Sequence, residues 1–280
     1  MEKTWNDFAK TKEFLICIDS DGCVMDTMDV KHMRCLGPCL VHEWGLSEFK
    51  DEIIDLWRRV NLVSSGRGAN RFQGLAMVLS DIQDNYMRLE GLEDYLEWVR
   101  TTDELSIPSL EKACAEKGSV CMKKALEWAD LVNKSMVMIS DNRKQPFDGT
   151  EEALQIAREY ADVVIVTAAN GDEIEKEWET YDIYQYIDLL MSQEMGIKSD
   201  CLKSLLEKGY TPDHVIMIGD APADLEAAKE AGVLFYPVLA YQERKSWRQF
   251  PEVVKRFTEG SYAGEYEEEL IKAFRKNLRM

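Results

Sequence analysis

The 280-residue sequence has no apolar run that approaches the ~18 residues needed for a membrane-spanning helix. Its N-terminus, Met-Glu-Lys-Thr-Trp-Asn-Asp, lacks the cationic and apolar regions of a signal peptide. Only seven cysteines occur, an odd and scattered set that does not resemble a disulfide framework. We therefore expect a soluble, cytoplasmic protein that has no membrane partner.

Positive charge is also scarce, because 34 basic residues stand against 52 acidic ones, for a net charge of −18. Such a surface repels phosphate backbones and anionic lipids, which argues against a nucleic-acid partner. An anionic substrate would need a metal ion or a local cluster of cations. The hydrophobic fraction of 45% supports a sizeable core, and 280 residues favour two domains.

The segment from Phe14 to Asp26 organises the chain. Its first five residues, Phe14 to Ile18, are all apolar, which predicts a strand buried on both faces of a parallel sheet. The run stops at Asp19, and Asp21 and Gly22 follow in a tight turn. Ligands bind outside the carboxyl ends of such strands, so two carboxylates stand where chemistry is expected. The alternative is a strand that merely ends in an acidic turn.

The pattern changes after this strand. Between Thr27 and about Pro146, apolar residues recur at the three- and four-residue spacing of amphipathic helices. The predicted helices are 48–60, 73–89, 92–100, 109–116 and 121–134. We therefore assign residues 27–146 to a helical domain, inserted into a second domain of residues 1–26 and 147–280.

Sheet-forming sequence returns after the helical block. Buried strands are predicted at 162–167, 187–191, 215–219 and 233–239. Helices at 151–160, 172–180, 199–208 and 222–231 alternate with them, and the part from Trp247 onwards is helical. Alternation of this kind predicts an α/β fold with a parallel sheet covered on both faces.

Polar residues end three of the predicted strands at one edge of the sheet, accompanied by a lysine and a further acid on nearby helices. They are Asp19, Asp21, Thr167, Lys198, Asp220 and Asp224. In this pattern the sequence resembles the haloacid dehalogenase-like hydrolase superfamily. The motifs of that family are Asp-x-Asp-Gly, a Thr or Ser ending a second strand, a Lys, and Gly-Asp-x-x-x-Asp. All four occur here in that order, within about residues 13–26 and 147–239.

The resemblance implies a Rossmann-like core with a helical cap, and a Mg²⁺-dependent phosphohydrolase that acts on a small phosphorylated metabolite. Asp19 would attack phosphorus and form an aspartyl-phosphate. Asp21 would donate its carbonyl to the metal and act as general acid and base. Asp19, Asp220 and Asp224 would form the metal site together with Asp21, and Asp224 would orient a metal-bound water or Lys198.

The same resemblance assigns the phosphoryl oxygens to Thr167 and the neighbouring backbone at Ala168. Lys198 would add positive charge beside Asp19. Lys203 is the alternative for that role, but Lys198 is favoured because it stands at the start of its helix, facing the strand ends.

In the helical block, the segment from Ser64 to Arg71 is the candidate for reading the substrate. Arg67 and Arg71 stand among serines and glycines and could bind an anionic or hydroxyl-bearing group. A solvated loop with structural arginines explains the same residues equally well.

Four further residues, His32, Cys35, Cys39 and His42, could bind structural zinc. Their spacing does not match the familiar zinc signatures, and Gly37-Pro38 is expected to break any continuous helix there. Buried core cysteines are the favoured interpretation.

Two alternatives to a phosphatase stay open at this point. A phosphosugar mutase keeps the same acid as Asp21, and a non-catalytic phosphometabolite-binding protein could keep the fold. Dehalogenase relatives lack an acid at that position and phosphonate-cleaving relatives usually have a small residue there, so both are disfavoured.

Overall fold

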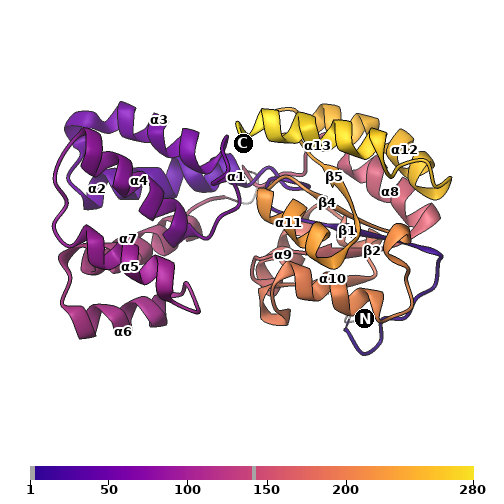
Figure 1. Cartoon of the computed structure of the whole chain (residues 1–280), viewed down its shortest axis with the longest axis horizontal. Helices are drawn as coiled ribbons and strands as arrows, with labels where there is room; N and C mark the ends of the chain where they lie inside the picture. Colours follow the sequence, from indigo (N-terminus) through magenta and orange to yellow (C-terminus); the bar gives the residue numbers. More distant parts are fainter. Residues whose placement is uncertain (1–3, 141–142) are drawn as a thin grey trace. The chain divides into compact units, whose positions relative to one another are not determined.

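The computed structural model describes residues 4–140 and 143–280 (Figure 1). The chain divides into two compact units, Met1–Thr27 with Asp141–Met280, and Met28–Ser140. We call the first the sheet unit and the second the helical unit. Across the residues that the structure describes, no helix combines the length and apolar character that crossing a membrane requires.

The sheet unit contains a five-stranded sheet in the order β3-β2-β1-β4-β5, and every pair of neighbours is parallel. The strands are β1 Phe14–Ile18, β2 Ala161–Val166, β3 Leu189–Met191, β4 Val215–Gly219 and β5 Leu234–Pro237. Leu15 to Ile18 of the central strand are fully buried. The expected α/β class with a parallel sheet is confirmed, because the apolar runs form strands that are covered on both faces.

Alternate side chains of β1 enter two separate apolar clusters. Ile16 and Ile18 pack with residues of α8, α9 and α12, whereas Leu15 and Cys17 pack with residues of α10, α11 and α13. These helices are α8 Thr150–Tyr160, α9 Gly171–Thr180, α10 Lys198–Leu206, α11 Pro222–Ala231, α12 Glu243–Thr258 and α13 Glu265–Asn277. The two-residue period of the strand thus supplies both faces of the core.

The helical unit has its own core, in which Trp57 and Trp128 approach with ring centroids 6.1 Å apart. Its helices are α1 Met28–Lys31, α2 Gly37–Glu43, α3 Lys50–Asn61, α4 Arg71–Asn85, α5 Leu92–Thr101, α6 Ile107–Lys117 and α7 Val120–Val137. The five helices expected from the apolar spacing correspond to α3 through α7. Their ends differ from the expected ones by a few residues because capping, which periodicity does not report, decides where a helix stops.

The expectation that Gly37-Pro38 breaks the helix is wrong. α1, a π-helical turn at His32–Leu36 and α2 follow one another without a gap. The Gly37 N–H donates to the His32 carbonyl, five residues back. Pro38 then lies in the first turn of α2, directly after the wider π turn.

A buried acid on β2 holds the N-terminal segment against the sheet. The Asp162 carboxylate accepts the backbone N–H groups of Thr11 and Lys12, at 2.9 Å each, and the hydroxyl of Tyr210. Only 1% of Asp162 is exposed. Hydrogen bonds to a charged acceptor are among the stronger ones, so this carboxylate stabilises the segment that leads into β1.

Asp162→Ala should lower the free energy of unfolding by about 3 kcal/mol, because the buried Tyr210 hydroxyl and the backbone N–H groups of Thr11 and Lys12 lose their acceptor. Urea denaturation followed by circular dichroism measures the loss. Asp148→Ala is the control, since Asp148 is exposed and pairs only loosely with Arg244, at 3.5 Å. Equal stability losses in the two variants would contradict the role assigned to Asp162.

Candidate active site

A turn at the end of β1 carries the first two acids; we call Asp19–Met25 the acid turn. The Ser20 carbonyl accepts the N–H groups of Val24 and Met25, at 2.9 Å each, and so closes the turn. Gly22 has a φ of +78°, a left-handed conformation that residues with a side chain avoid. The turn therefore leaves Asp19 at the carboxyl edge of the sheet.

Three carboxylates meet at this edge. One oxygen each of Asp19, Asp220 and Asp224 lies within 4.8 Å of the others, and all three residues are buried. Asp19 and Asp220 come together because β1 and β4 are neighbours, with Ile18 opposite Ile218. The Asp19 N–H donates to the Ile218 carbonyl at 2.9 Å, which extends the pairing into the acid turn.

Lys198 lies inside this cluster. Its Nζ is 2.9 Å from Asp19 Oδ1 and 2.5 Å from Asp224 Oδ1. Burial alone would lower the pKa of Lys198, but the two carboxylates outweigh it and hold the pKa above its ordinary value. The alternative, Lys203, is 49% exposed and lies 3.8 Å from Asp200, away from the three acids.

The electrostatics of the cluster favour a further cation. Burial raises the pKa of the Asp19 carboxyl, Lys198 lowers it and the Asp224 and Asp220 carboxylates raise it, and the net result is a pKa of about 8. Ionisation of Asp19 beside two other carboxyl groups therefore calls for positive charge beyond that of Lys198. A buried set of carboxylate oxygens at this spacing fits a hard divalent ion such as Mg²⁺.

Both carboxylate oxygens of Asp224 are engaged within the protein. Oδ1 accepts from Lys198, and Oδ2 accepts the Ala221 N–H at 2.9 Å. Asp224 thus begins α11 and holds Lys198 at the same time. The close approach requires Gly219, where an added Cβ would lie 2.3 Å from Asp224 Cγ and Oδ2.

Thr167 follows β2, the other neighbour of β1. It is buried, and its Oγ1 accepts the Ala169 N–H at 3.2 Å. Ala168 is exposed beside it. These residues therefore stand at the same edge of the sheet as Asp19, because β1 and β2 are parallel and in register.

Asp21 does not join the three clustered carboxylates. It is partly exposed, and its Oδ1 accepts a hydrogen bond from the hydroxyl of Thr27, a fully buried residue. Among the residues that could hold a metal through their side chains, Asp21 is therefore set apart from Asp19, Asp220 and Asp224.

The two arginines expected to read the substrate differ in their surroundings within the helical unit. Arg67 is buried, and its Nη1 donates to the Leu62 carbonyl at 3.0 Å. Arg71 is half-buried at the start of α4, and its Nη1 donates to Asn133 Oδ1 at 2.7 Å. Arg67 thus shapes its own loop, whereas Arg71 reaches the surface.

The suggested zinc ligands do not form a metal-binding group in the part of the chain that the structure describes. His32 Nδ1 accepts the Trp57 indole N–H at 3.2 Å, Cys39 Sγ lies 3.6 Å from Ser135 Oγ, and His42 is exposed. Within residues 4–140 and 143–280, the only group of three or more His, Cys, Asp or Glu side chains at ligating distance is that of Asp19, Asp220 and Asp224.

Three contacts to the acid turn could not be expected from the sequence. The Thr27 hydroxyl donates to Asp21, the Trp178 indole to Ser20 Oγ, and the Trp247 indole to the Cys23 carbonyl. No local motif marks either tryptophan, since each is far from the turn along the chain.

The model of the haloacid dehalogenase-like hydrolase family matches residues 100–238. That segment contains Thr167, Lys198, Asp220 and Asp224, while the acid turn that completes the four motifs lies outside it. The chain belongs to the haloacid dehalogenase-like hydrolases. The resemblance seen in the four motifs is confirmed.

Solved structures resemble this hydrolase over most of its length. A provisionally named haloacid dehalogenase-like hydrolase from Bacteroides fragilis is 15% identical, with a TM-score of 0.52, and the match covers 84% of this chain and 93% of that one. A hydrolase of the family from Xanthomonas campestris is 13% identical, with a TM-score of 0.50 and coverage of 92% and 97%.

A provisionally named phosphatase from Clostridium difficile is 15% identical, with a TM-score of 0.50 and coverage of 81% and 86%. At such identities the likeness concerns the fold. The comparison with curated proteins found no match.

Gly219→Ala should lower the free energy of unfolding of this hydrolase by about 1–3 kcal/mol, because the new methyl group displaces the Asp224 carboxylate. Chemical denaturation measures the change. Gly171→Ala is the matched control, since the first atom its Cβ meets is the flexible Ser192 Oγ, at 3.0 Å. Similar losses in both variants would contradict the packing argument for Gly219.

Proposed function

We propose that this hydrolase is a Mg²⁺-dependent phosphatase that moves the phosphoryl group of a small phosphorylated metabolite to Asp19 and then to water. The observation that carries the proposal is the buried cluster in which Asp19 lies beside Lys198 and the carboxylates of Asp220 and Asp224. The phosphatase name of the Clostridium difficile protein agrees with it.

Asp19 is the nucleophile of the proposed reaction. Attack on phosphorus forms an aspartyl-phosphate and releases the alcohol, and hydrolysis of that intermediate regenerates the carboxylate. An anionic substrate would be repelled by the acids alone. Lys198, 2.9 Å from Asp19 Oδ1, places positive charge beside the attacking oxygen.

Asp19 and Asp220 would hold Mg²⁺ through their side chains, together with the backbone carbonyl of Asp21. When bound, the ion supplies charge neutralisation between the carboxylates and the phosphoryl oxygens. Asp224 would act through Lys198, because its two oxygens already accept from Lys198 and the Ala221 N–H.

Asp21 serves as general acid toward the leaving oxygen and then as general base toward water. The Thr27 hydroxyl donates a hydrogen bond to Asp21 Oδ1 and would orient this carboxyl group. Thr167 and the exposed backbone at Ala168 would hold the phosphoryl oxygens at the neighbouring strand end.

The helical unit, as a cap, would choose the substrate. Of the two arginines considered, half-buried Arg71 is the better candidate for an anionic or hydroxyl-bearing substrate group, because Arg67 is buried and bonded to its own loop. A phosphosugar mutase would use the same nucleophile, but would return the phosphoryl group to substrate instead of water.

Asp19→Asn should abolish phosphate release, because an amide is a poor nucleophile, while the folded state is kept, because a buried amide carries no charge to desolvate. Phosphate release is measured on a panel of sugar phosphates and other phosphomonoesters, with Mg²⁺ and with EDTA. We expect activity only with the metal.

Asp200→Asn is the control for this experiment, since Asp200 is 65% exposed on α10 and outside the acid cluster. Phosphate release by Asp19→Asn at the wild-type rate would contradict the assignment of Asp19 as the nucleophile. Phosphate transfer between sugar positions, with no release to water, would favour the mutase.

Arg71→Ala should raise KM by about 10-fold with little change in kcat, as expected for the loss of a charge-assisted contact that is equally strong in ground and transition states. Arg67→Ala should instead lower the melting temperature, because its buried contact to Leu62 is lost. Arg59→Ala is the control, since Arg59 is half exposed and pairs with Asp55. An unchanged KM for Arg71→Ala would place Arg71 with the structural residues.

A further inference from the structure

The acid turn is held from the side of the core as well as at the active site. Ser20 stands between Asp19 and Asp21 in the sequence, yet it is fully buried. Its Oγ accepts the indole N–H of Trp178 at 2.9 Å, and Trp178 is also fully buried. The residue that joins the two proposed catalytic acids is therefore tied to a tryptophan in the core.

The hydrogen bond between Trp178 and Ser20 satisfies a buried donor that would otherwise have no acceptor. A buried indole N–H needs an acceptor, and an unmet one costs about 1–3 kcal/mol. The Ser20 carbonyl already accepts the Val24 and Met25 N–H groups, so its backbone acceptor closes the turn while its hydroxyl receives Trp178. One residue thus sets both the shape of the acid turn and its position on the core.

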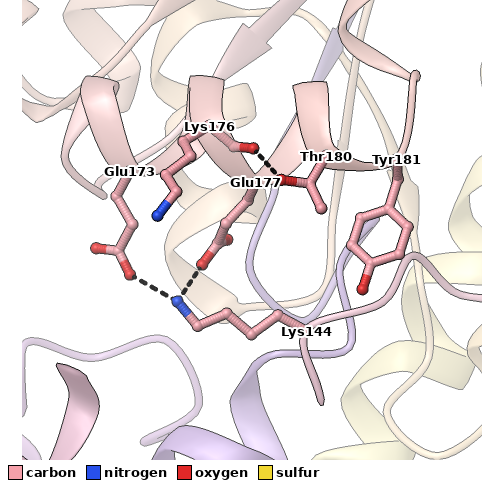
Figure 2. Close-up of a pocket in the computed structure, with 6 residues that line it drawn as sticks. All are labelled: Lys144, Glu173, Lys176, Glu177, Thr180 and Tyr181. Carbon is pink, nitrogen blue, oxygen red and sulfur yellow. Dashed lines mark hydrogen bonds and ion pairs between the residues drawn. The ribbon is translucent and has the colours of Figure 1, made fainter. Parts of the chain in front are cut away.

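The helix that carries Trp178 is itself fixed at the neighbouring residue. Glu177 Oε1 lies 2.7 Å from Lys144 Nζ, and Glu173 Oε1 lies 3.5 Å from it (Figure 2). Lys144 precedes Gln145, whose carbonyl accepts the Asp26 N–H at 2.7 Å. Trp178 of α9 therefore holds the acid turn. The preceding residue, Glu177, holds Lys144, which is next to the residue that pairs with Asp26 just after the turn.

The cavity beside this contact does not offer a competing explanation. Lys144, Glu173, Lys176, Glu177, Thr180 and Tyr181 line a space of about 80 Å³ (Figure 2). Ligand pockets typically measure roughly 300–1,000 Å³, so this space is too small for a metabolite. The ion pairs at its wall position α9.

We propose that Trp178 is a positioning residue for phosphoryl transfer, which acts through its hydrogen bond to Ser20 and keeps Asp19 and Asp21 in place. The inference rests on the proposed function. Misplacing a reacting group by ~1 Å can cost about 100-fold in rate. A shift of the acid turn therefore lowers kcat without removing any group that binds substrate.

Trp178→Phe tests this, because phenylalanine keeps an aromatic ring in the core and removes only the N–H donor and part of the indole volume. We expect kcat for phosphate release to fall about 10-fold and KM to change less than about 2-fold. Ser20→Ala removes the acceptor and should have the same effect. The double variant should be no slower than either single one, because both remove one shared bond.

Trp128→Phe is the matched control. Trp128 is also fully buried and donates its indole N–H to the Leu36 carbonyl at 3.1 Å, within the helical unit. It should keep the wild-type kcat. Unchanged kcat in Ser20→Ala, or losses that multiply in the double variant, would overturn the proposal. Ser20→Ala, a small change, decides the matter if Trp178→Phe fails to fold.

A spectroscopic measurement separates this proposal from the proposed function. In two-dimensional ¹H–¹⁵N spectra, Trp178→Phe and Ser20→Ala should shift the same backbone amides, those of residues 19–22, and Trp128→Phe should not. Absence of that shared shift would overturn the positioning role. A wild-type protein that releases no phosphate from the panel, but has the shared shift, would overturn the phosphatase assignment and leave the positioning of the acid turn supported.

Discussion

The contact of Lys198 with Asp19 and Asp224 is the interaction on which the rest of the site depends. Three buried carboxylates at one sheet edge would repel one another without it. The ammonium at 2.9 and 2.5 Å compensates part of that charge. What remains uncompensated is negative, and this makes the cluster suited to a divalent cation and, through the cation, to a phosphoryl group.

The contact between Asp224 and Lys198 also places requirements on the backbone around the cluster. Asp224 can hold Lys198 only because Gly219 leaves room for its carboxylate. The same carboxylate accepts the Ala221 N–H and so begins α11. Asp224 therefore both caps α11 and contributes to the electrostatics of the site. A movement of α11 would also move the carboxylate that pairs with Lys198.

The acid turn has to be supported from a second direction, because the metal and substrate would contact only its open side. Two buried tryptophans provide that support, Trp178 from α9 and Trp247 from α12, by donating indole N–H groups to Ser20 and Cys23. Both indoles belong to the same apolar cluster as Ile16 and Ile18 of β1. The core that stabilises the sheet thus also orients the acids at its edge.

Much of this protein was determined by local sequence alone. Uninterrupted apolar runs predicted the strands, because a central parallel strand must be apolar on both faces, and the four motifs identified Asp19, Thr167, Lys198 and Asp220 as strand-end or helix-start groups. Tertiary structure decided what local sequence cannot encode. It buried Arg67 against its own loop and let the chain pass Gly37-Pro38 through a π turn. It also joined Trp178 to Ser20 across 158 residues, since a hydrogen bond between distant segments depends on how helices pack on the sheet, and spacing along the chain carries no record of that packing.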